Sequence, residues 1–289
     1  MKTYNELFRE NAELPEEAYR ELRTGFISAF RDELVGRRLM PTLALPASTQ
    51  SYAYDRIKSD PSMAAIVAKS AGFPYHEYDA ERLTVAVPKI GWAFKIPRED
   101  FLAGVIQNQQ VDFARRKIAE KEDSLIFDGD NDFGILGLMD FAGNTAGATA
   151  DWAASATVIE IYNDVKNIVG LLMADKVAGP YNMVVNPLQW VALGKYDTTA
   201  QRTAEELVRR LVSDILVSYT VPDGTVLVMR TGPDIARLGV VEDLTVETPL
   251  YDADHQEYRG RAFERIVPII YQYGSTANKS DAIATITSA

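Results

Sequence analysis

The sequence predicts an α+β fold in which an extended hairpin, one long amphipathic helix and an α/β unit follow one another. Three observations support this prediction: aromatic and apolar residues alternate within 48–98, helical periodicity runs from Gln109 to Asp128, and short helices alternate with buried strands within 150–250. The chain of 289 residues can bury a substantial core, as one elaborate domain or as two modest ones.

Charge and composition narrow the possible functions. The formal net charge is -11, and the basic runs Arg115-Arg116-Lys117 and Arg209-Arg210 stand among carboxylates. Tight binding to nucleic acid needs a cluster of cations that neutralises phosphates, so the sequence argues against a nucleic-acid-binding surface. The chain has no cysteine, which excludes disulfides, thiolate metal sites and cysteine nucleophiles.

Neither a secretory signal nor a membrane span is predicted. The segment Met1 to Glu6 lacks the basic start and the apolar core of a signal peptide. No apolar run approaches the length of about 20 residues that crosses a bilayer. We therefore expect the protein to be made and assembled in a cytoplasm, with no membrane as a partner.

The first expected elements are a helix and an extended arm. Pro15 suits a first helical position, and apolar residues recur at helical spacing as far as Leu34. A helix is therefore predicted over 15–35, and Gly36 is expected to end it. From Leu39 to Gln50 the chain carries two prolines and no helical period, so this segment is predicted to run extended.

Two long strands follow the arm, and the second of them changes phase along its length. Tyr52 and Tyr54 alternate as in a strand, Val85 and Val87 keep one phase, and the next apolar residues keep the opposite phase. The change of phase at Pro88-Lys89 predicts a bulge or a bend that exposes the proline on an edge. A projecting hairpin of this kind is expected to lie on a neighbouring subunit. The phase-shifted residues are Ile90, Trp92, Phe94 and Ile96.

A long exposed helix is predicted after the hairpin. Between Gln109 and Asp128, apolar residues fall on roughly one side and charged residues elsewhere. Asp128-Gly129 is expected to stop the helix. The small residues from Gly143 to Ala150 are expected to form a flexible separator before the α/β unit.

The α/β unit and the end of the chain complete the pattern. Asp234 to Gly239 is ambiguous, the apolar run Ala262 to Tyr271 is expected to return as a long strand to the first sheet despite Pro268, and the tail from Ser275 is expected on the surface. Helices are predicted at Thr157–Ala174, Pro187–Leu193 and Thr203–Val212, the last capped by Thr203, and strands at Tyr181–Val185, Ile215–Tyr219 and Thr225–Met229.

No catalytic constellation stands out. The only histidines, His76 and His255, lie far apart, and the chain has no GxGxxG, GxxxxGK[ST] or GxSxG motif. Asp128 to Gly134 begins like a calcium loop but has Phe133 where a glycine is needed and Met139 where a bidentate glutamate is needed. We interpret this segment as a turn, and we predict no catalytic, cofactor-binding or metal-binding residue.

Two groups of carboxylates were candidates for acid and base chemistry. A glycosidase pair needs a cleft in which one acid is desolvated. Both groups lie in polar segments that are expected to be exposed, so we interpret them as solvated surface. The groups are Glu120, Glu122 and Asp123, and Asp252 and Asp254.

Several motifs, in this order and spacing, resemble encapsulins and the encapsulin-like major capsid proteins of tailed phages. The resemblance is strongest over 34–140 and continues more weakly, in the right order, through Gly179 to Asn186 and Phe263 to Tyr271. The motifs of the first part are Leu34-Val-Gly-Arg-Arg-Leu39, Ser51-Tyr-Ala-Tyr-Asp-Arg-Ile57, Val87-Pro-Lys-Ile90, the helix Phe113 to Asp123, and Ile126-Phe-Asp-Gly129 with Gly134-Ile-Leu-Gly-Leu138.

The resemblance implies the Hong Kong 97-type capsid fold. In that fold an N-terminal arm, an extended loop, a peripheral domain with a long spine helix and an axial α/β domain follow one another. The implied division is 1–47 for the N-terminal helix and arm, 48–98 for the extended loop, 99–149 with 251–289 for the peripheral domain, and 150–250 for the axial domain.

The resemblance also implies a function. The chain would be a structural subunit, without enzymatic activity or cofactor, that assembles with itself into pentamers and hexamers of an icosahedral shell. The arm Tyr52 to Arg56 and the helix with Ala114-Arg115-Arg116 favour a phage major capsid protein. Such a protein would enclose double-stranded DNA in a virion without sequence-specific binding, with portal, scaffolding or decoration proteins as candidate partners.

Two alternatives stay open. The first is an encapsulin, whose shell is a cytoplasmic nanocompartment that encloses cargo enzymes. The more distant one is a soluble α/β hydrolase. For the shell hypotheses, the predicted contacts between subunits lie on the extended loop, at Tyr52, Tyr54, Arg56, Phe73, Tyr75 and Trp92.

Overall fold

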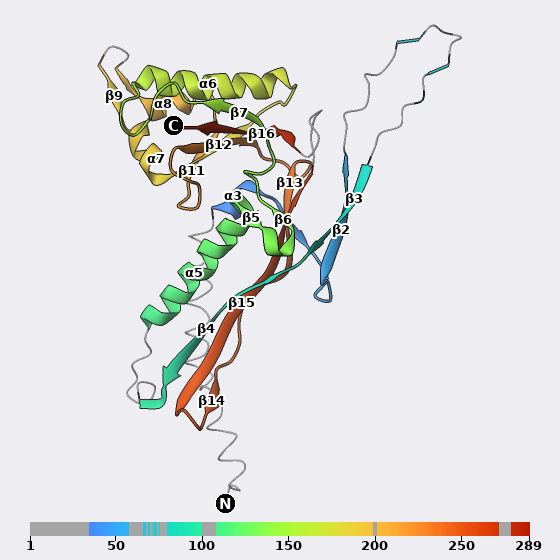
Figure 1. Ribbon diagram of the computed structural model, residues 1–289, viewed down its shortest axis with the longest axis vertical. Coiled ribbons are helices and arrows are strands. Elements are labelled where there is room, and N and C mark those ends of the chain that lie inside the picture. Colours follow the sequence, from blue (N-terminus) through green and yellow to red (C-terminus); the bar gives the residue numbers. More distant parts are fainter. Residues whose placement is uncertain are drawn as a thin grey trace, which may run out of the picture.

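Two sheets and a projecting ribbon organise the protein (Figure 1). The computed structural model describes residues 35–57, 66–67, 69, 72–73, 75, 80–99, 108–198, 201–271 and 279–289. The helix expected over 15–35 lies outside the described residues. The α+β class predicted from the sequence is confirmed.

The first sheet, which we call the long-strand sheet, is built around the 14-residue strand β15. β4 pairs with β15 along 257–265 and β13 pairs with it along 262–270, so the two neighbours lie on opposite sides of β15. β1 adds to β13 in parallel, and β14 pairs with the first residues of β15. The strands are β1 (Thr42–Ala44), β4 (Lys89–Pro97), β13 (Ala236–Val246), β14 (Leu250–Asp252) and β15 (Glu257–Ile270).

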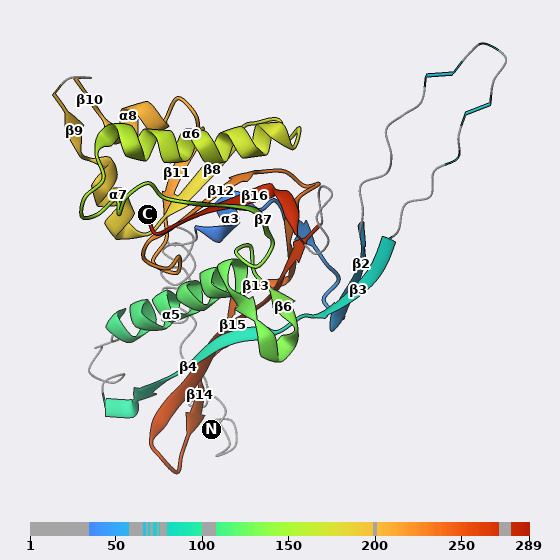
Figure 2. The same ribbon diagram turned by 45° about the horizontal axis from the view of Figure 1, so that its top comes forward.

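One helix covers this sheet. α5 (Asn108–Phe127) packs against β4 and β15 and runs obliquely across them (Figures 1 and 2). Its apolar stripe includes Ile118 and Leu125, both almost fully buried. The predicted long helix and the predicted long returning strand are therefore both confirmed.

The second sheet, the α/β sheet, has the strand order β11-β8-β12-β16-β7. Helix α6 packs on β7 and β16, and Thr157 begins it with a capping box shared with Glu160. α7 and α8 are short helices of the same unit, and α8 is capped by Thr203 as predicted. The elements are β7 (Ala142–Gly147), α6 (Val158–Ala174), β8 (Tyr181–Val185), α7 (Pro187–Leu193), α8 (Ala204–Val208), β11 (Asp214–Val217), β12 (Thr225–Arg230) and β16 (Ser280–Thr287).

The ribbon is the two-stranded antiparallel sheet of β2 (Ser51–Ile57) and β3 (Ala80–Ala86). Both ribbon views show it leaving the two sheets at an angle and pointing away from them (Figures 1 and 2). At its root, Tyr54 is buried and packs edge-on against Tyr271, with ring centroids 5.6 Å apart. The predicted projecting hairpin is therefore present in its described strands.

The change of phase at Pro88 marks a bend, which is one of the two causes expected, but the proline does not lie on an exposed edge. β3 pairs with β2, whereas β4 pairs with β15 in the long-strand sheet, so the chain passes from one sheet to the other at this point. Pro88 is buried at the crossing and is not exposed on an edge. A bend between two sheets, rather than a bulge within one, explains the pattern.

The end of the chain also differs from the expectation. β16 is buried along almost its whole length between β12 and β7, so this described part of the tail does not lie on the surface. Gly143 to Ala150 is not a flexible separator, because most of it forms β7 in parallel with β16. Small residues such as Ala282 and Ala284 fit a strand that is covered on both faces, and their low hydrophobicity hid that strand.

The division predicted at 150 and 250 does not follow the sheets. β7 and β16 belong to the α/β sheet, although they lie in ranges assigned to the peripheral domain. β13, which includes the ambiguous segment Asp234 to Gly239, belongs to the long-strand sheet, although its range was assigned to the axial domain.

Smaller elements join the sheets. α3 (Gly36–Leu39) is one helical turn before β1, and β9 (Tyr196–Asp197) pairs with β10 (Arg202–Thr203). The predicted turn after α5 consists of β5 (Gly129–Asp130), the 3-10 turn η1 (Asn131–Phe133) and β6 (Ile135–Leu136). Asp130 accepts a hydrogen bond from the backbone N–H of Asp132, which caps η1.

Gly129 makes the sharp end of α5 possible. Its φ of +78° is left-handed, and a Cβ atom on it would lie 2.3 Å from the backbone oxygen of Ile135. We expect Gly129→Ala to lower the free energy of unfolding by about 2 kcal/mol, measured by denaturant unfolding. Gly170→Ala is the matched control: Gly170 is exposed within α6 and a Cβ atom there meets nothing within 4 Å. The control should stabilise by about 0.5 to 1 kcal/mol, and equal effects of the two variants would contradict this account.

Candidate functional site

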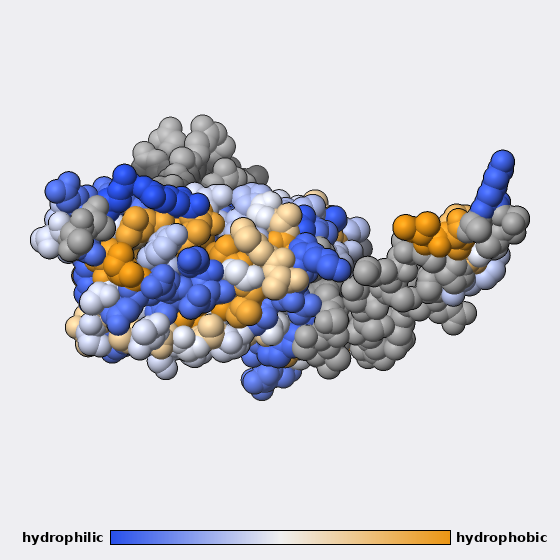
Figure 3. All heavy atoms as spheres, turned by 90° about the horizontal axis from the view of Figure 1, so that it is seen from above, coloured by the Kyte–Doolittle hydropathy of each residue, from blue (hydrophilic) through white to orange (hydrophobic). Residues whose placement is uncertain are grey.

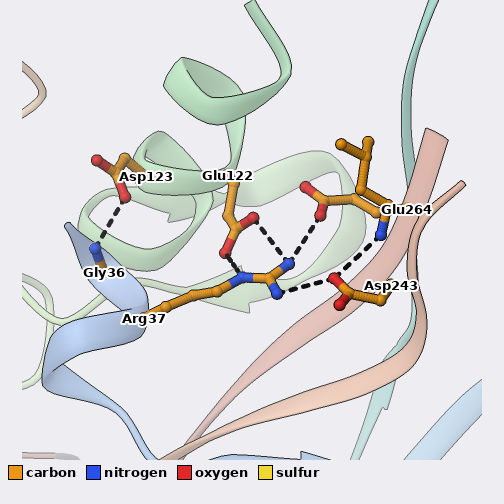
Figure 4. A network of polar contacts seen from close by, with 7 residues as sticks. Gly36, Arg37, Glu122, Asp123, Asp243 and Glu264 are labelled. Carbon is orange, nitrogen blue, oxygen red and sulfur yellow. Dashed lines mark hydrogen bonds and ion pairs between the residues drawn. The ribbon is translucent and has the colours of Figure 1, made fainter. Parts of the chain in front are cut away.

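A cluster of buried charges ties the start of the described chain to both α5 and the long-strand sheet (Figure 4). We call Arg37, Glu122, Asp243 and Glu264 the Arg37 cluster. Arg37 Nε and Nη2 donate to the two oxygens of Glu122, at 2.7 and 3.2 Å. Nη2 also donates to Glu264 Oε2 at 2.9 Å, and Nη1 donates to Asp243 Oδ1 at 2.8 Å. The guanidinium therefore joins α3 to α5, β13 and β15.

Burial makes these contacts electrostatically strong. The side chains of Glu122 and Glu264 are fully buried, Arg37 is 19% exposed, and Asp243 is 55% exposed. Burial lowers the pKa of Arg37, but the hydrogen bond and the charge of Glu122 outweigh this effect and raise the pKa overall. Arg37 is therefore charged at every accessible pH.

A second contact holds the same helical turn. The backbone N–H of Gly36 donates to Asp123 Oδ1 at 2.9 Å. Burial raises the pKa of Asp123 to about 6, although the hydrogen bond from Gly36 opposes the shift. A Cβ atom on Gly36 would lie 2.5 Å from Ile126 Cδ1, so the glycine allows α3 to approach α5 closely. Gly36 begins the helical turn α3, and the helix that it was expected to end lies outside the described residues.

The segment after α3 is held to the long-strand sheet as far as the ribbon. Leu45 N–H donates to Val240 O at 2.8 Å, and Arg265 donates from its two Nη atoms to the carbonyl oxygens of Ala47 and Thr49. Val87 N–H then donates to Gln50 O at 2.9 Å, at the point where the ribbon begins. The ribbon is thus anchored at its root through an ordered arm that starts at the Arg37 cluster.

Beyond the ribbon, three of the described apolar residues between β2 and β3 are exposed. Ile66 is fully exposed and Phe73 is 71% exposed, and Tyr75 is also fully exposed. Seen from above, hydrophobic residues are visible at the far end of the projection that begins with the ribbon (Figure 3). Exposed apolar side chains on a projection away from the core are typical of a surface that another molecule covers.

The six predicted contact residues occupy different environments. Phe73 and Tyr75 are exposed beyond the ribbon, whereas Tyr52 is half-buried and stacks with the buried Tyr54 at 6.4 Å between ring centroids. Trp92 is 40% exposed on β4 and packs edge-on against Phe113. Arg56 lies in β2, and its side chain is outside the described structure. Contact of these residues with a neighbour stays a prediction.

Exposed hydrophobic residues also lie on the α/β unit. Seen from above, hydrophobic residues are visible between hydrophilic ones on the face that α6 covers (Figure 3). Scattered exposed apolar residues are ordinary on a protein surface. In α7, however, three of the seven residues are apolar side chains that are about half exposed or more. The residues are Ile159, Leu171 and Met173 on α6, and Leu188, Trp190 and Val191 on α7.

The acidic groups weighed in the sequence are placed differently from the expectation. Glu122 and Asp123 are buried, so their assignment to solvated surface is wrong. A signal was available, because Ile118, Glu122 and Leu125 follow one another at helical spacing on the apolar side of α5. The partner Arg37 could not be found in this way, because it comes from a separate segment 85 residues away.

The other acidic group is engaged in ordinary surface ion pairs. Asp252 accepts from Arg259 Nη1 at 2.9 Å and contacts His255 Nδ1 at 3.0 Å. Within the described ranges, no group of three or more His, Cys, Asp or Glu residues is arranged to hold a metal ion. Among the helices that the structure describes, none combines the length and the apolar character of a membrane span.

Comparison with known proteins decides the family. A family model described as "Encapsulating protein for peroxidase" (Linocin_M18) matches residues 4–259. The chain belongs to this family. It is 27% identical over 239 residues to the type 1 encapsulin shell protein EncA of Myxococcus xanthus (strain DK1622). This match covers 80% of this chain and 82% of EncA.

A second relative is a fusion protein. The chain is 27% identical over 131 residues to a diheme-cytochrome-encapsulin shell fusion protein of Kuenenia stuttgartiensis. This match covers 45% of this chain and 35% of the relative, so the chain spans about a third of that protein's length. The remainder of the fusion protein has no counterpart in this alignment.

Solved shell structures share the fold. The virus-like particle from Pyrococcus furiosus matches with a TM-score of 0.68 at 16% identity, over 93% of this chain and 99% of that chain. The capsid of Myoviridae phage XM1 matches with a TM-score of 0.64 at 12% identity, over 86% of this chain and 89% of that chain. The Hong Kong 97-type capsid fold implied by the sequence motifs is therefore confirmed, and the chain is a structural subunit of an encapsulin-type or capsid-type shell.

The Arg37 cluster makes a direct prediction for stability. We expect Arg37→Met to lower the free energy of unfolding by about 3 kcal/mol, because the buried Glu122 would lose its cation and the buried Glu264 would lose a hydrogen-bond donor. The neighbouring Arg38→Met is the matched control, since Arg38 is 60% exposed and pairs with the exposed Asp214. The control should cost at most about 1 kcal/mol. Denaturant unfolding compares the two, and equal losses would contradict the assigned role of the cluster.

Proposed function

We propose that this chain is the subunit of an encapsulin-type shell, which assembles from pentamers, with or without hexamers, into a closed icosahedral particle that encloses protein cargo. The match to the family of encapsulating proteins along residues 4–259 carries this proposal. The particle would be a cytoplasmic nanocompartment, and the chain itself would act as a wall and not as an enzyme.

The charge of the chain supports protein cargo over DNA. With a formal net charge of -11 and no cationic cluster in the sequence, the wall would repel a tightly packed polyanion rather than neutralise it. The preference for a phage capsid, drawn from the arm and the Arg-rich helix, has no support in the family match. The likeness to phage capsids supports the fold alone, because the capsid of Myoviridae phage XM1, for example, is only 12% identical to this chain.

The ribbon supports assembly with further copies. A stable interface between proteins buries about 1,200 to 2,000 Å² in total, and a projecting ribbon can contribute area that the chain cannot bury on itself. We propose that 48–98 acts as the extended loop and that Tyr52, Tyr54, Arg56, Phe73, Tyr75 and Trp92 line its contacts. We further propose that 1–47, 99–149 with 251–289, and 150–250 act as the arm, peripheral and axial parts, except that β7 and β16 join the axial part and β13 joins the peripheral part.

Electron microscopy of the purified chain tests the proposal. Expressed alone, without portal, scaffolding or decoration proteins, the chain should form closed particles of uniform diameter. After nuclease treatment, the particles should show the ultraviolet absorbance ratio of protein and contain no double-stranded DNA. A chain that stays monomeric at high concentration, or particles filled with protected duplex DNA, would contradict the proposal.

Shortening the ribbon tests its role in assembly. A variant in which 58–79 is replaced by Asn-Gly joins Ile57 to Ala80, a directly opposite pair of the ribbon, by a two-residue hairpin turn. We expect its circular dichroism and thermal unfolding to stay close to those of the parent chain, while closed particles are lost in electron micrographs. If the variant still formed closed particles, the ribbon would have no essential part in assembly.

A further inference from the structure

In the Arg37 cluster, two buried carboxylates share one guanidinium. Arg37 donates to the carboxylates of Glu122 and Glu264 and to that of the more exposed Asp243. Two of them, Glu122 and Glu264, have fully buried side chains that water cannot screen. Buried like charges so close together cannot both remain ionised without a large free-energy cost.

The hydrogen bonds show which carboxylate is under-satisfied. Both oxygens of Glu122 accept from Arg37, whereas Glu264 accepts only through Oε2. Glu264 Oε1 is buried and has no hydrogen-bond partner among the described residues. An ionised oxygen in that position would be left without a donor, whereas a protonated one could itself donate to a neighbouring carboxylate.

We propose that the Glu264 carboxyl carries a proton in the folded protein, that it shares this proton with Glu122, and that the proton keeps the Arg37 cluster closed. The cluster then holds α3 to the rest of the subunit by a contact that is lost at alkaline pH, and we call this contact the clasp. Loss of the proton would leave two buried carboxylates facing each other beside one guanidinium. The clasp would open, and α3 would detach from α5 and β15.

The charged groups around Glu264 support this assignment from each packed element. Arg37 faces it from α3, Glu122 from α5 and Asp243 from β13, while its register partner on β4 is the apolar Ile90. The pKa of Glu264 is raised to about 10, chiefly by burial and then by the charge of Glu122, while the charge of Arg37 opposes the shift. Burial also raises the pKa of Asp123, the other buried acid of α5, to about 6; the hydrogen bond from Gly36 opposes this shift and the charge of Glu122 adds to it.

The direction of the pH effect follows from these shifts. A carboxyl whose pKa is higher in the folded than in the unfolded protein favours folding most when it is protonated. The contribution of Glu264 to stability therefore falls as the pH rises from its ordinary value of 4.5 toward about 10. Acid leaves this clasp closed and alkali opens it, opposite to the behaviour of a carboxylate that is ionised in an ion pair.

Infrared spectroscopy tests the proton directly. At neutral pH the wild-type protein should show the carbonyl band of a buried, protonated carboxylic acid, and the band should disappear on titration toward pH 10. Isotope labelling of glutamate should shift the band and labelling of aspartate should not, which distinguishes Glu264 from Asp123. Absence of a glutamic acid band at neutral pH would overturn the proposal. This measurement requires only the folded chain, so its result is independent of shell formation.

A variant tests the consequence. Glu264→Gln keeps a donor for Glu122 and an acceptor for Arg37 but cannot lose a proton. We expect the alkaline midpoint, followed by light scattering of particles or by circular dichroism of subunits, to rise by about one pH unit. Lysine and tyrosine titration contributes equally to both proteins, and Asp252→Asn, outside the cluster, is the control that should leave the midpoint unchanged. An unchanged midpoint in Glu264→Gln would overturn the clasp, and if this variant failed to fold, the infrared titration of the wild type would still decide.

Discussion

The fold depends on how one buried guanidinium is neutralised. Arg37 comes from a single helical turn, and without its side chain that turn would touch the body of the protein mainly through Gly36 and Leu39. Through Glu122, Asp243 and Glu264 it reaches one helix and two strands that are far apart in the sequence. Desolvation makes each of these charges costly when unpaired, so the elements can only meet in the arrangement that pairs them. The arm toward the ribbon begins at this fixed point.

The ribbon is stabilised differently from the two sheets. The two sheets bury apolar residues on packed faces, as Ile266 and Val267 of β15 and Met183 and Val184 of β8 show. A two-stranded hairpin has no such layer and is at best marginally stable in water on its own. In this protein its root is held by Tyr54 against Tyr271, while Phe73 and Tyr75 farther along have no such cover. A second copy of the chain can provide the missing layer, and this need links the fold to assembly.

The sequence predicted those features that depend on local pattern. Helical periodicity located α5 and α6, a run of buried residues located β8, and the phase change at Pro88 marked a real break between strands. Contacts between segments that are far apart in the sequence could not be predicted from local pattern. β16 is rich in alanine and threonine, and it is an interior strand only because β12 and β7 pair with it on either side. Glu122 was predicted to be solvated because its partner Arg37 is distant in sequence. Motif order over 34–140 identified the shell fold, but it could not separate an encapsulin from a phage capsid, for which the family match was needed.

Hydrogen exchange measured by mass spectrometry tests most directly whether a neighbouring subunit completes the ribbon. Amide exchange would be compared between dissociated subunits and closed particles of the same chain. We expect amides of β2 and β3 to exchange rapidly in subunits and to become strongly protected in particles, while those of α5 and β15 are protected in both. Equal protection of β2 and β3 in the two states would contradict it, because the ribbon would then be stable without a neighbour.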